Sequence, residues 1–272
     1  MGRIITIASG KGGVGKTMLT ANIGVALSQN GYSVLMVDAD IAMANLSLLL
    51  GLHSSPITLH DVLLGESSID DAIYDGPAGT KFIPSGLSLD SYRRVDTDRL
   101  ESVVKSIAGS YDFILLDAPP GIEKNVMASL AAADEVLLVT MPNPPSIADV
   151  LKTKLVAQRL GGNPIGVVIN FSTGEKGEIS SDDIMKMLEL PVYGVIPLDA
   201  EVRRSFMQEN VQPLILRKPD APASSAIRKL AAKIAGVREI AYVPAQEKKG
   251  FLSRLKGIFK LGKKQPKSAK TK

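Results

Sequence analysis

The feature that most constrains the fold is a glycine-rich octapeptide that follows an apolar run near the N-terminus. It consists of Gly10, Lys11, Gly12, Gly13, Val14, Gly15, Lys16 and Thr17. This spacing fits the pattern G-x-x-x-x-G-K-[ST], which joins a strand to the first turn of a helix. Glycines let backbone N–H groups turn inward around phosphate groups, and the helix N-terminus adds its positive dipole end. The octapeptide therefore predicts a strand–loop–helix unit that binds nucleotide phosphates.

Short apolar runs alternate with longer helical patterns along the rest of the chain. We expect strands at residues 4–9, 33–38, 81–84, 112–117, 135–140, 165–170 and 192–196. We expect helices at residues 16–29, 97–108, 123–132, 146–160, 181–188 and 223–235. Most strand runs are continuous in Val, Ile and Leu, which is typical of strands covered on both faces. The pattern predicts an α/β fold of the P-loop NTPase type, a mostly parallel sheet with helices on both faces.

Acidic residues follow two of the predicted strands. Asp38 and Asp40 come at the end of one strand, and Asp117 ends another. The carboxyl ends of parallel strands lie on the ligand side of such a sheet. In phosphoryl transfer the loop lysine, here Lys16, cradles the β- and γ-phosphates, while the loop Thr17 and a strand-end acid hold Mg²⁺. We expect Asp117 to meet Mg²⁺ through water, whereas Asp38 and Asp40 have helix capping as an alternative.

The loop sequence resembles the deviant Walker A motif of the MinD and ParA ATPases, in which an additional lysine follows the first glycine. The resemblance implies that Lys11 reaches across an ATP-bound homodimer to the partner's phosphates, although a solvated loop lysine is the alternative. It also implies that Asp40 orients the attacking water, so that Lys11, Lys16 and Asp40 are catalytic. By the same resemblance, to the pattern D-x-D-x-x-x-x-N, Asp38 supports the magnesium site and Asn45 shapes the loop near the γ-phosphate.

Two later segments resemble the adenine pocket of the same family. Asn170 ends a predicted strand, and Pro197, Leu198 and Asp199 belong to an I-P-x-D turn. An asparagine amide can pair with both donor and acceptor edges of adenine. The chain lacks the guanine-specific N-K-x-D motif, so the resemblance implies ATP with Mg²⁺ as cofactors. A strand-end cap is the alternative for these positions.

Further positions extend or depart from the resemblance. Residues 118–121 resemble a second switch that senses the γ-phosphate. Asn143, Ser146 and Asp149 resemble a segment that contacts the signature lysine and the dimer partner, although Ser146 is equally a plain helix cap. The family usually has Ser or Thr at the position of Met18, so backbone N–H groups must hold the α-phosphate here.

Charge is distributed unevenly along the chain. The formal net charge is +4, but residues 248–272 contain ten Lys or Arg and no acid. The preceding 247 residues carry 22 basic and 28 acidic residues, a net charge of −6. A strongly basic segment on an acidic body favours an anionic partner for that segment, and a solubilising role is the alternative.

The basic segment is also amphipathic. We expect a P-loop ATPase domain at residues 1–241, a linker at 242–247, a helix at 248–264 and a disordered basic tail at 265–272. At about 100° per residue, one half of the helix is apolar and the other half is rich in lysine. The apolar half, which we expect to enter a membrane, consists of Phe251, Leu252, Leu255, Ile258, Phe259 and Leu261. This profile is typical of an interfacial helix that binds anionic lipid, and docking on a protein surface is the alternative.

The segment K-K-G-F-L-S-R-L at residues 248–255 resembles the membrane-targeting tail of MinD, so the resemblance extends over residues 3–261. It implies an ATP-hydrolysing spatial regulator that dimerises with ATP and binds membrane reversibly. It implies roles in placing the division site or other cellular machinery, together with an effector or activator protein that the sequence does not identify. The implied location is cytoplasmic and peripheral, at the inner face of the cell membrane.

The composition of the chain bears on other classes of function. A ParA-type DNA partition ATPase, an FlhG-type regulator of appendage number and a lipid-binding adaptor with an inactive site are the alternatives. The acidic body disfavours DNA as the partner. The chain has no Cys and two His, which excludes cysteine-ligated iron–sulfur clusters and argues against a His-rich zinc site. No apolar run reaches the ~20 residues that span a bilayer.

Overall fold

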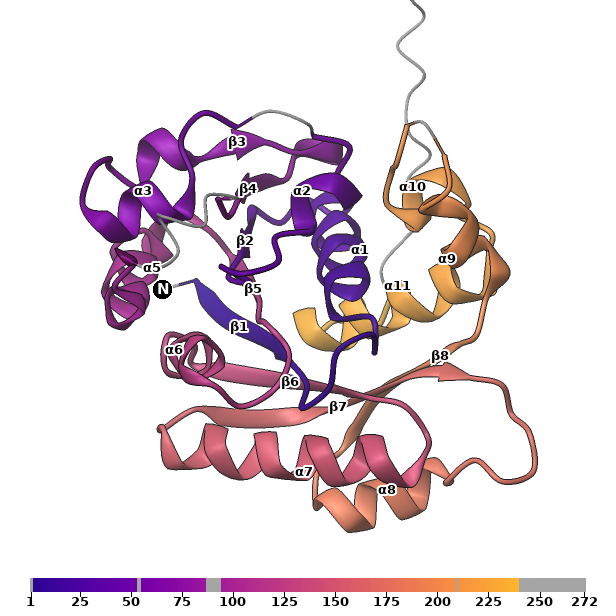
Figure 1. The fold of residues 1–272 in the computed structure, drawn as a ribbon. Coiled ribbons are helices and arrows are strands. Elements are labelled where there is room, and N and C mark those ends of the chain that lie inside the picture. The colour runs from indigo at the N-terminus through magenta and orange to yellow at the C-terminus, as the bar shows by residue number, and fades with distance from the viewer. Residues whose placement is uncertain (1, 53–54, 87–93, 209, 240–272) are drawn as a thin grey trace, which may run out of the picture.

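The computed structural model describes residues 2–52, 55–86, 94–208 and 210–239 (Figure 1). The predicted linker, membrane helix and basic tail at 242–272 lie outside the described residues, so these boundaries stay predictions. Among the described residues, no helix combines the length and the apolar character needed to cross a membrane.

The strands are β1 (Arg3–Ala8), β2 (Val34–Asp38), β3 (Tyr74–Asp75), β4 (Lys81–Ile83), β5 (Phe113–Asp117), β6 (Glu135–Thr140), β7 (Asn163–Ser172) and β8 (Val192–Pro197). The α-helices are α1 (Lys16–Gln29), α2 (Leu46–Leu49), α3 (Leu59–Leu64), α5 (Leu100–Ser106), α6 (Lys124–Ala131), α7 (Pro144–Arg159), α8 (Ser181–Leu188), α9 (Ala200–Ser205), α10 (Leu214–Arg217) and α11 (Pro222–Ala235). Short 3-10 turns are η1 (Asp70–Ala72), η2 (Pro77–Gly79), η3 (Thr97–Arg99) and η4 (Ala108–Ser110).

The strands form one eight-stranded sheet in the order β3-β4-β2-β5-β1-β6-β7-β8. The β3–β4 pair is antiparallel and every other pair is parallel. This confirms the predicted mostly parallel sheet. Parallel pairing with short loops brings the carboxyl ends of β1, β2 and β5 to one edge of the sheet, where the predicted phosphate loop lies.

Helices cover both faces of the sheet, as predicted. Alternate residues of β1 point to opposite faces, so Ile5 and Ile7 pack with α1 and α11, while Ile4 packs with α5. Helices α6, α7 and α8 pack with the β6–β7 part of that second face. All three β1 side chains are buried, which explains why the strand reads as a continuous apolar run.

The sequence predicted the long helices and seven of the eight strands and missed the short helices and β3. Helices α1 and α8 have the predicted bounds. The predicted helix at 97–108 is divided into η3, which the Asp96 carboxylate caps, and α5, which ends at Ser106. Strand β3 and helices α2, α3, α9 and α10 were not predicted, because two to six residues are too few to display a period.

Close packing of α1 on β2 generates a stability prediction. Gly24 faces β2, and a Cβ at this position would stand 2.4 Å from Sδ of the fully buried Met36. Gly24→Ala should gain at most about 1 kcal/mol of helix propensity but lose about 1–3 kcal/mol to overpacking. We expect Gly24→Ala to lower the free energy of unfolding measured in urea. Because Met36→Ala removes the side chain that the new methyl group meets, the double variant should be more stable, by at least about 0.5 kcal/mol, than the sum of the two single effects predicts.

Gly109→Ala is the matched control, because a Cβ at Gly109 would meet no atom within 4 Å. A Gly24→Ala protein that is more stable than the parent would contradict this account of the α1–β2 contact.

Candidate functional site

The loop between β1 and α1 forms a cradle lined by backbone. Gly13 and Gly15 have φ values of 78° and 94°, in the left-handed region that other residues enter only with strain. A Cβ at Gly10 would stand 2.3 Å from the backbone oxygen of Asp149 in α7. The shape of the loop and its close contact with α7 therefore require glycine at these positions.

Lys16 opens α1 with a buried side chain that is 7% exposed. Its Nζ donates to Oγ of Ser9 at 3.0 Å, and that hydroxyl donates to the backbone oxygen of Lys11 at 2.7 Å. Burial lowers the pKa of Lys16, while the negative charges of Asp117 and Asp40 act to raise it. A buried ammonium group at the mouth of a glycine cradle is placed to pair with an anion.

Asp38 and Asp117 lie side by side in register at the carboxyl ends of β2 and β5. Both are buried, and Thr20 Oγ1 donates to Asp117 Oδ1 at 3.3 Å. Burial raises the pKa of Asp117 to about 7, although a hydrogen bond from Thr17 and the charge of Lys16 act to lower it. Burial, and then the charge of Asp117, raise the pKa of Asp38 well above its usual range. Two buried carboxyls beside a hydroxyl are hard oxygen ligands of the kind that Mg²⁺ prefers.

Asp38 also anchors the loop that follows β2. Its carboxylate accepts from the backbone N–H groups of Asp40 at 3.2 Å, Asn45 at 3.1 Å and Leu46 at 3.0 Å. Within the loop, Asp40 Oδ1 accepts from the backbone N–H of Met43, and Asn45 Nδ2 donates to the backbone oxygen of Met43. The helix-capping role given above as the alternative for Asp38 is therefore present in the structure. The same contacts hold Asp40 and Asn45 beside the phosphate cradle.

A cavity of about 400 Å³ opens beside the cradle. One side is formed by the loop and the start of α1, including Lys16, Thr17 and Met18. The other walls are mostly apolar and consist of Leu48, Leu49, Phe171, Val202 and Phe206, with Asn45 at the margin. A cavity of this size with an apolar wall and a polar loop is the usual form of a small-molecule site.

Asn170 is fully buried behind the cradle rather than open to the cavity. Its Nδ2 donates to the backbone oxygen of Val14 at 2.8 Å, and a Cβ at Gly15 would stand 2.3 Å from this nitrogen. Its Oδ1 has no hydrogen-bond partner among the described residues. Asn170 therefore ties the end of β7 to the phosphate loop and keeps one buried acceptor for a ligand donor.

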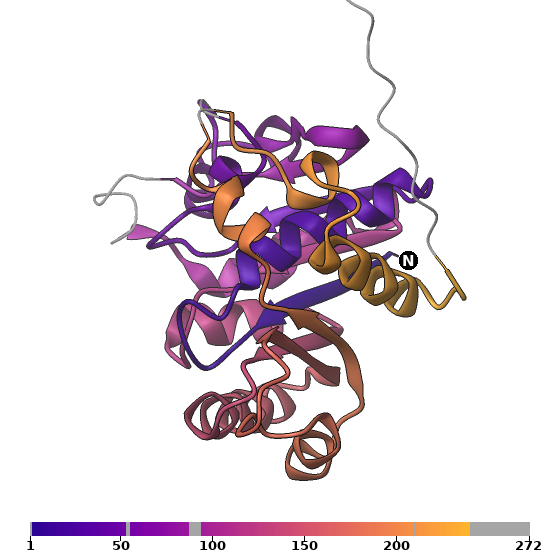
Figure 2. The same cartoon turned by 90° about the vertical axis from the view of Figure 1, so that its right-hand side faces the viewer.

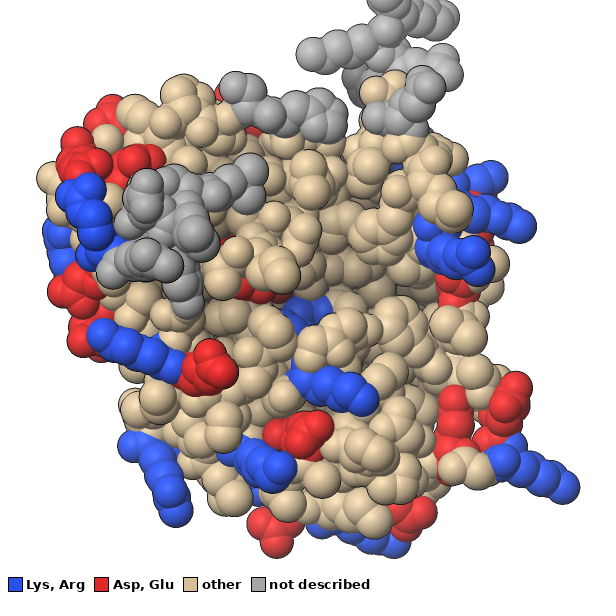
Figure 3. Space-filling view, viewed as in Figure 1, with Lys and Arg blue, Asp and Glu red and all other residues tan. Residues whose placement is uncertain are grey.

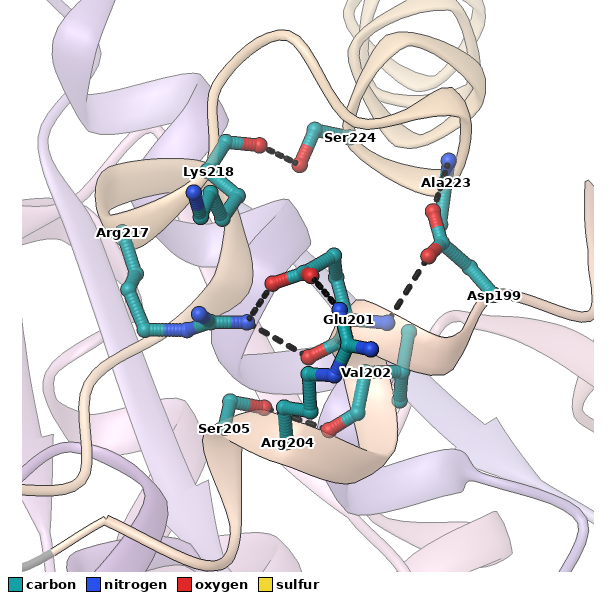
Figure 4. Close-up of polar contacts among 9 residues, drawn as sticks. All are labelled: Asp199, Glu201, Val202, Arg204, Ser205, Arg217, Lys218, Ala223 and Ser224. Atoms are coloured by element: carbon teal, nitrogen blue, oxygen red, sulfur yellow. Dashed lines mark hydrogen bonds and ion pairs between the residues drawn. The ribbon is translucent and has the colours of Figure 1, made fainter.

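Polar contacts hold the turn after β8 and the helix α9 that follows it (Figure 4). Asp199 caps α9 by accepting from the N–H of Glu201 at 2.9 Å, and it accepts from the N–H of Ala223 in α11 at 3.2 Å. Glu201 pairs with Arg217 at 2.9 Å, which links α9 to α10. These contacts hold the helix that supplies two cavity walls, Val202 and Phe206.

The remaining predicted positions lie around this region. Pro197 ends β8, and Leu198 is exposed while its N–H donates to the backbone oxygen of Ser172 at 2.8 Å. Lys11 is exposed on the loop. Asn143 is the N-cap of α7 and accepts from the N–H of Ser146 at 3.1 Å, so Ser146 is not the cap.

Several site residues escaped sequence reasoning. Ser9 and Thr20 contact Lys16 and Asp117, and Thr20 could have been found because it follows Thr17 by three residues on the same side of α1. The cavity walls carry no local signal, since they come from α2, the end of β7 and α9, which the fold alone brings together.

A parallel α/β sheet with a glycine cradle between β1 and α1, and with acids at the ends of β2 and β5, defines a P-loop nucleotide-binding protein. Residues 5–212 match the family described as the CobQ/CobB/MinD/ParA nucleotide binding domain. The chain is a MinD-like member of the MinD/ParA family of P-loop ATPases.

Three relatives span nearly the whole chain. An uncharacterised ATP-binding protein of Methanocaldococcus jannaschii is 43% identical, and the match covers 94% of this chain and 96% of that protein. The septum site-determining protein MinD of Pyrococcus horikoshii OT3, solved in complex with Mg-ADP, is 36% identical with a TM-score of 0.82, covering 86% of this chain and 96% of that chain. A MinC:MinD cell division protein complex of Aquifex aeolicus contains a chain that is 31% identical with a TM-score of 0.76, covering 90% of this chain and 98% of that chain.

The raised pKa of Asp117 generates a pH prediction for the metal-free protein. Because the folded state holds this proton up to about pH 7 and the unfolded state releases it near 3.8, the stabilising contribution is present below about pH 4. It is lost as the pH rises through about 7. Asp117→Asn cannot ionise, so its thermal midpoint in EDTA should fall less than that of the parent between pH 5 and pH 8. Equal falls in both proteins would contradict the assignment.

Proposed function

We propose that this chain is an ATP-hydrolysing spatial regulator that dimerises on ATP and binds membrane reversibly through its C-terminal segment. The observation that carries the proposal is the buried ammonium of Lys16 beside Asp117, at the mouth of a glycine cradle. That arrangement matches what nucleotide phosphates with a divalent ion require, a positive group for the phosphates next to carboxyl oxygens for the metal.

Thr17, Asp38 and Asp117 are the residues that would hold Mg²⁺, which neutralises developing charge on the phosphates when bound. Burial raises the pKa of Asp117 to about 7, and a divalent cation next to this carboxyl would favour its ionised form. Asp38 already accepts three backbone N–H groups, so it would support the site mainly by orienting its loop.

Three residues would carry the chemistry. Lys16 stabilises charge on the β- and γ-phosphates, and the backbone of Gly10 to Met18 surrounds them. Asp40, whose carboxylate accepts from the backbone N–H of Met43, orients the attacking water. Lys11 is exposed, so its ammonium can reach phosphates bound to a second copy.

An apolar rim around the cavity supports dimerisation over this face. Met43 is 70% exposed and Met207 is 73% exposed, and Leu48, Leu198 and Phe206 are also exposed. In Figure 3 the upper middle of this face is mostly uncharged, while acidic and basic side chains lie at its left and right margins, near its centre and across its lower half. Exposed apolar side chains that surround a ligand site indicate a surface that another protein covers.

The C-terminal segment would supply the membrane contact. Its ten basic residues and six apolar helix positions, Phe251, Leu252, Leu255, Ile258, Phe259 and Leu261, suit an anionic lipid surface. One short helix binds such a surface weakly, so two helices held in one dimer bind by avidity. Hydrolysis then separates the copies and releases them into the cytoplasm. The MinC:MinD complex suggests that a division-type effector or other positioned machinery is the target of the bound dimer.

Vesicle sedimentation tests the membrane cycle. The full chain should bind vesicles that contain phosphatidylglycerol with ATP and much less with ADP, because only the dimer gains avidity. Truncation after Glu247 should abolish binding, and Lys16→Ala should abolish its ATP dependence. Equal binding by the truncated chain would refute the tail's role, and ATP binding without phosphate release in the presence of lipid would favour a non-hydrolysing adaptor.

Asn170 generates a prediction on base selection. Its Nδ2 donates to Val14, so a base that reaches Asn170 would meet only the Oδ1 acceptor, which suits the 6-amino group of adenine and repels the 6-oxo group of guanine. ATP should bind about 3–10-fold more tightly than purine riboside triphosphate, which lacks the amino group, and GTP should bind more weakly than both. Calorimetry measures these affinities, and equal affinity for ATP and purine riboside triphosphate would remove Asn170 as a base reader.

A further inference from the structure

The outer face of α11 and the residues after it form a basic groove of about 240 Å³. Its basic members are Arg228, Lys229, Lys233 and Arg238, which we call the α11 basic face. Glu239 is the acidic residue that lines the same groove. Figure 2 shows α11, the yellow helix, at the surface of the molecule. This face belongs to none of the nucleotide, metal or dimer contacts described above.

The architecture of α11 explains why its charges gather on one side. Ile227, Leu230 and Ile234 are buried toward α1 and β8, so the opposite side of the helix faces water. Lys229 and Lys233 are spaced by four residues and lie in one row on that side. Lys233 Nζ donates to the backbone oxygen of Val192 at 2.6 Å and lies 4.7 Å from the ring centroid of Tyr193, which fixes its position.

Three of the basic residues of this face have no acidic partner among the described residues. Within the described part of the chain, Lys229, Lys233 and Arg238 form no ion pair with Asp or Glu. Val237, which is 41% exposed, adds an apolar side chain to the same groove. Basic groups next to an exposed aliphatic side chain match the boundary between phosphate headgroups and acyl chains.

The tether limits how far this face can stand from a membrane that holds the C-terminal segment. Residues 240–247 separate the groove from the basic segment and span at most about 28 Å even when fully extended. The first 247 residues carry a net charge of −6, so an anionic bilayer repels the body as a whole. At that range the body lowers its electrostatic energy by turning a basic surface toward the bilayer.

We propose that the α11 basic face docks directly on anionic phospholipid headgroups and orients the body on the membrane. The proposal rests on the membrane attachment proposed above and adds a second, folded contact to it. Each docked copy would keep α11 against the headgroups. Nucleic acid is the other polyanion that a basic groove could meet, but the acidic body around this groove opposes the broad phosphate tracking that DNA binding uses.

Charge reversal in the full chain tests the proposal. Lys229→Glu with Arg238→Glu removes the two groove charges for which the structure gives no hydrogen bond to another described residue. Arg159→Glu with Lys186→Glu is the matched control, because it changes the net charge equally on α7 and α8, across the sheet. Sedimentation with ATP would compare vesicles of phosphatidylglycerol with phosphatidylcholine against vesicles of phosphatidylcholine alone.

We expect the Lys229→Glu/Arg238→Glu chain to bind anionic vesicles about tenfold more weakly or worse, with little change in the control. Lipid-free ATPase activity and the thermal midpoint should stay unchanged in both. Unweakened binding, or equal weakening in the control, would overturn the docking face, while loss of binding on truncation after Glu247 would leave the tail proposal standing. No binding by the unaltered chain would overturn both. If the variant loses duplex DNA binding but keeps vesicle binding, the face recognises nucleic acid instead.

Discussion

The structure depends on the placement of the buried ammonium group of Lys16 beside the buried carboxyl of Asp117, which is itself in register with the buried carboxyl of Asp38. Burying ions is costly, and the cost is recovered only when partners are placed well. Asp38 and Asp117 stand in register because β2 and β5 are parallel neighbours, and β1 delivers the loop between them and α1. The parallel order of β2, β5 and β1 therefore places these charged side chains at one edge of the sheet.

Burying charged groups at that edge lowers the stability of the fold, although the site needs those groups. The sheet interior is apolar on both faces, while the edge collects groups whose pKa values are moved by burial. Such shifts mark groups that are poised for a ligand rather than for stability. Contacts from Asn170 to the phosphate loop and from Asp199 to α11 fix the backbone around this edge.

The nucleotide site and the α11 basic face lie on two helices, α1 and α11, that pack against each other. Helix α1 begins at the phosphate loop and packs against α11, whose outer side carries the basic groove. Asp199 connects the turn at the cavity to the first turn of α11. The phosphate loop and the α11 basic face are thus linked through packed helices, and the proposed membrane contact on α11 would leave the exposed apolar side chains around the cavity free for the proposed second copy.

The sequence by itself determined the fold class, the long helices and strands, and the positions of the phosphate loop and its acids. It could do so because the octapeptide and the apolar runs are local patterns, read within a few residues. Tertiary structure alone decided the partners of those residues: Ser9 and Thr20 in the site, the walls from Leu48 to Phe206, and the bond from Asn170 to Val14. These contacts join segments far apart in the chain, so no local pattern encodes them. The same holds for the α11 basic face, because helical spacing lists its charges but only packing on α1 and β8 turns them outward.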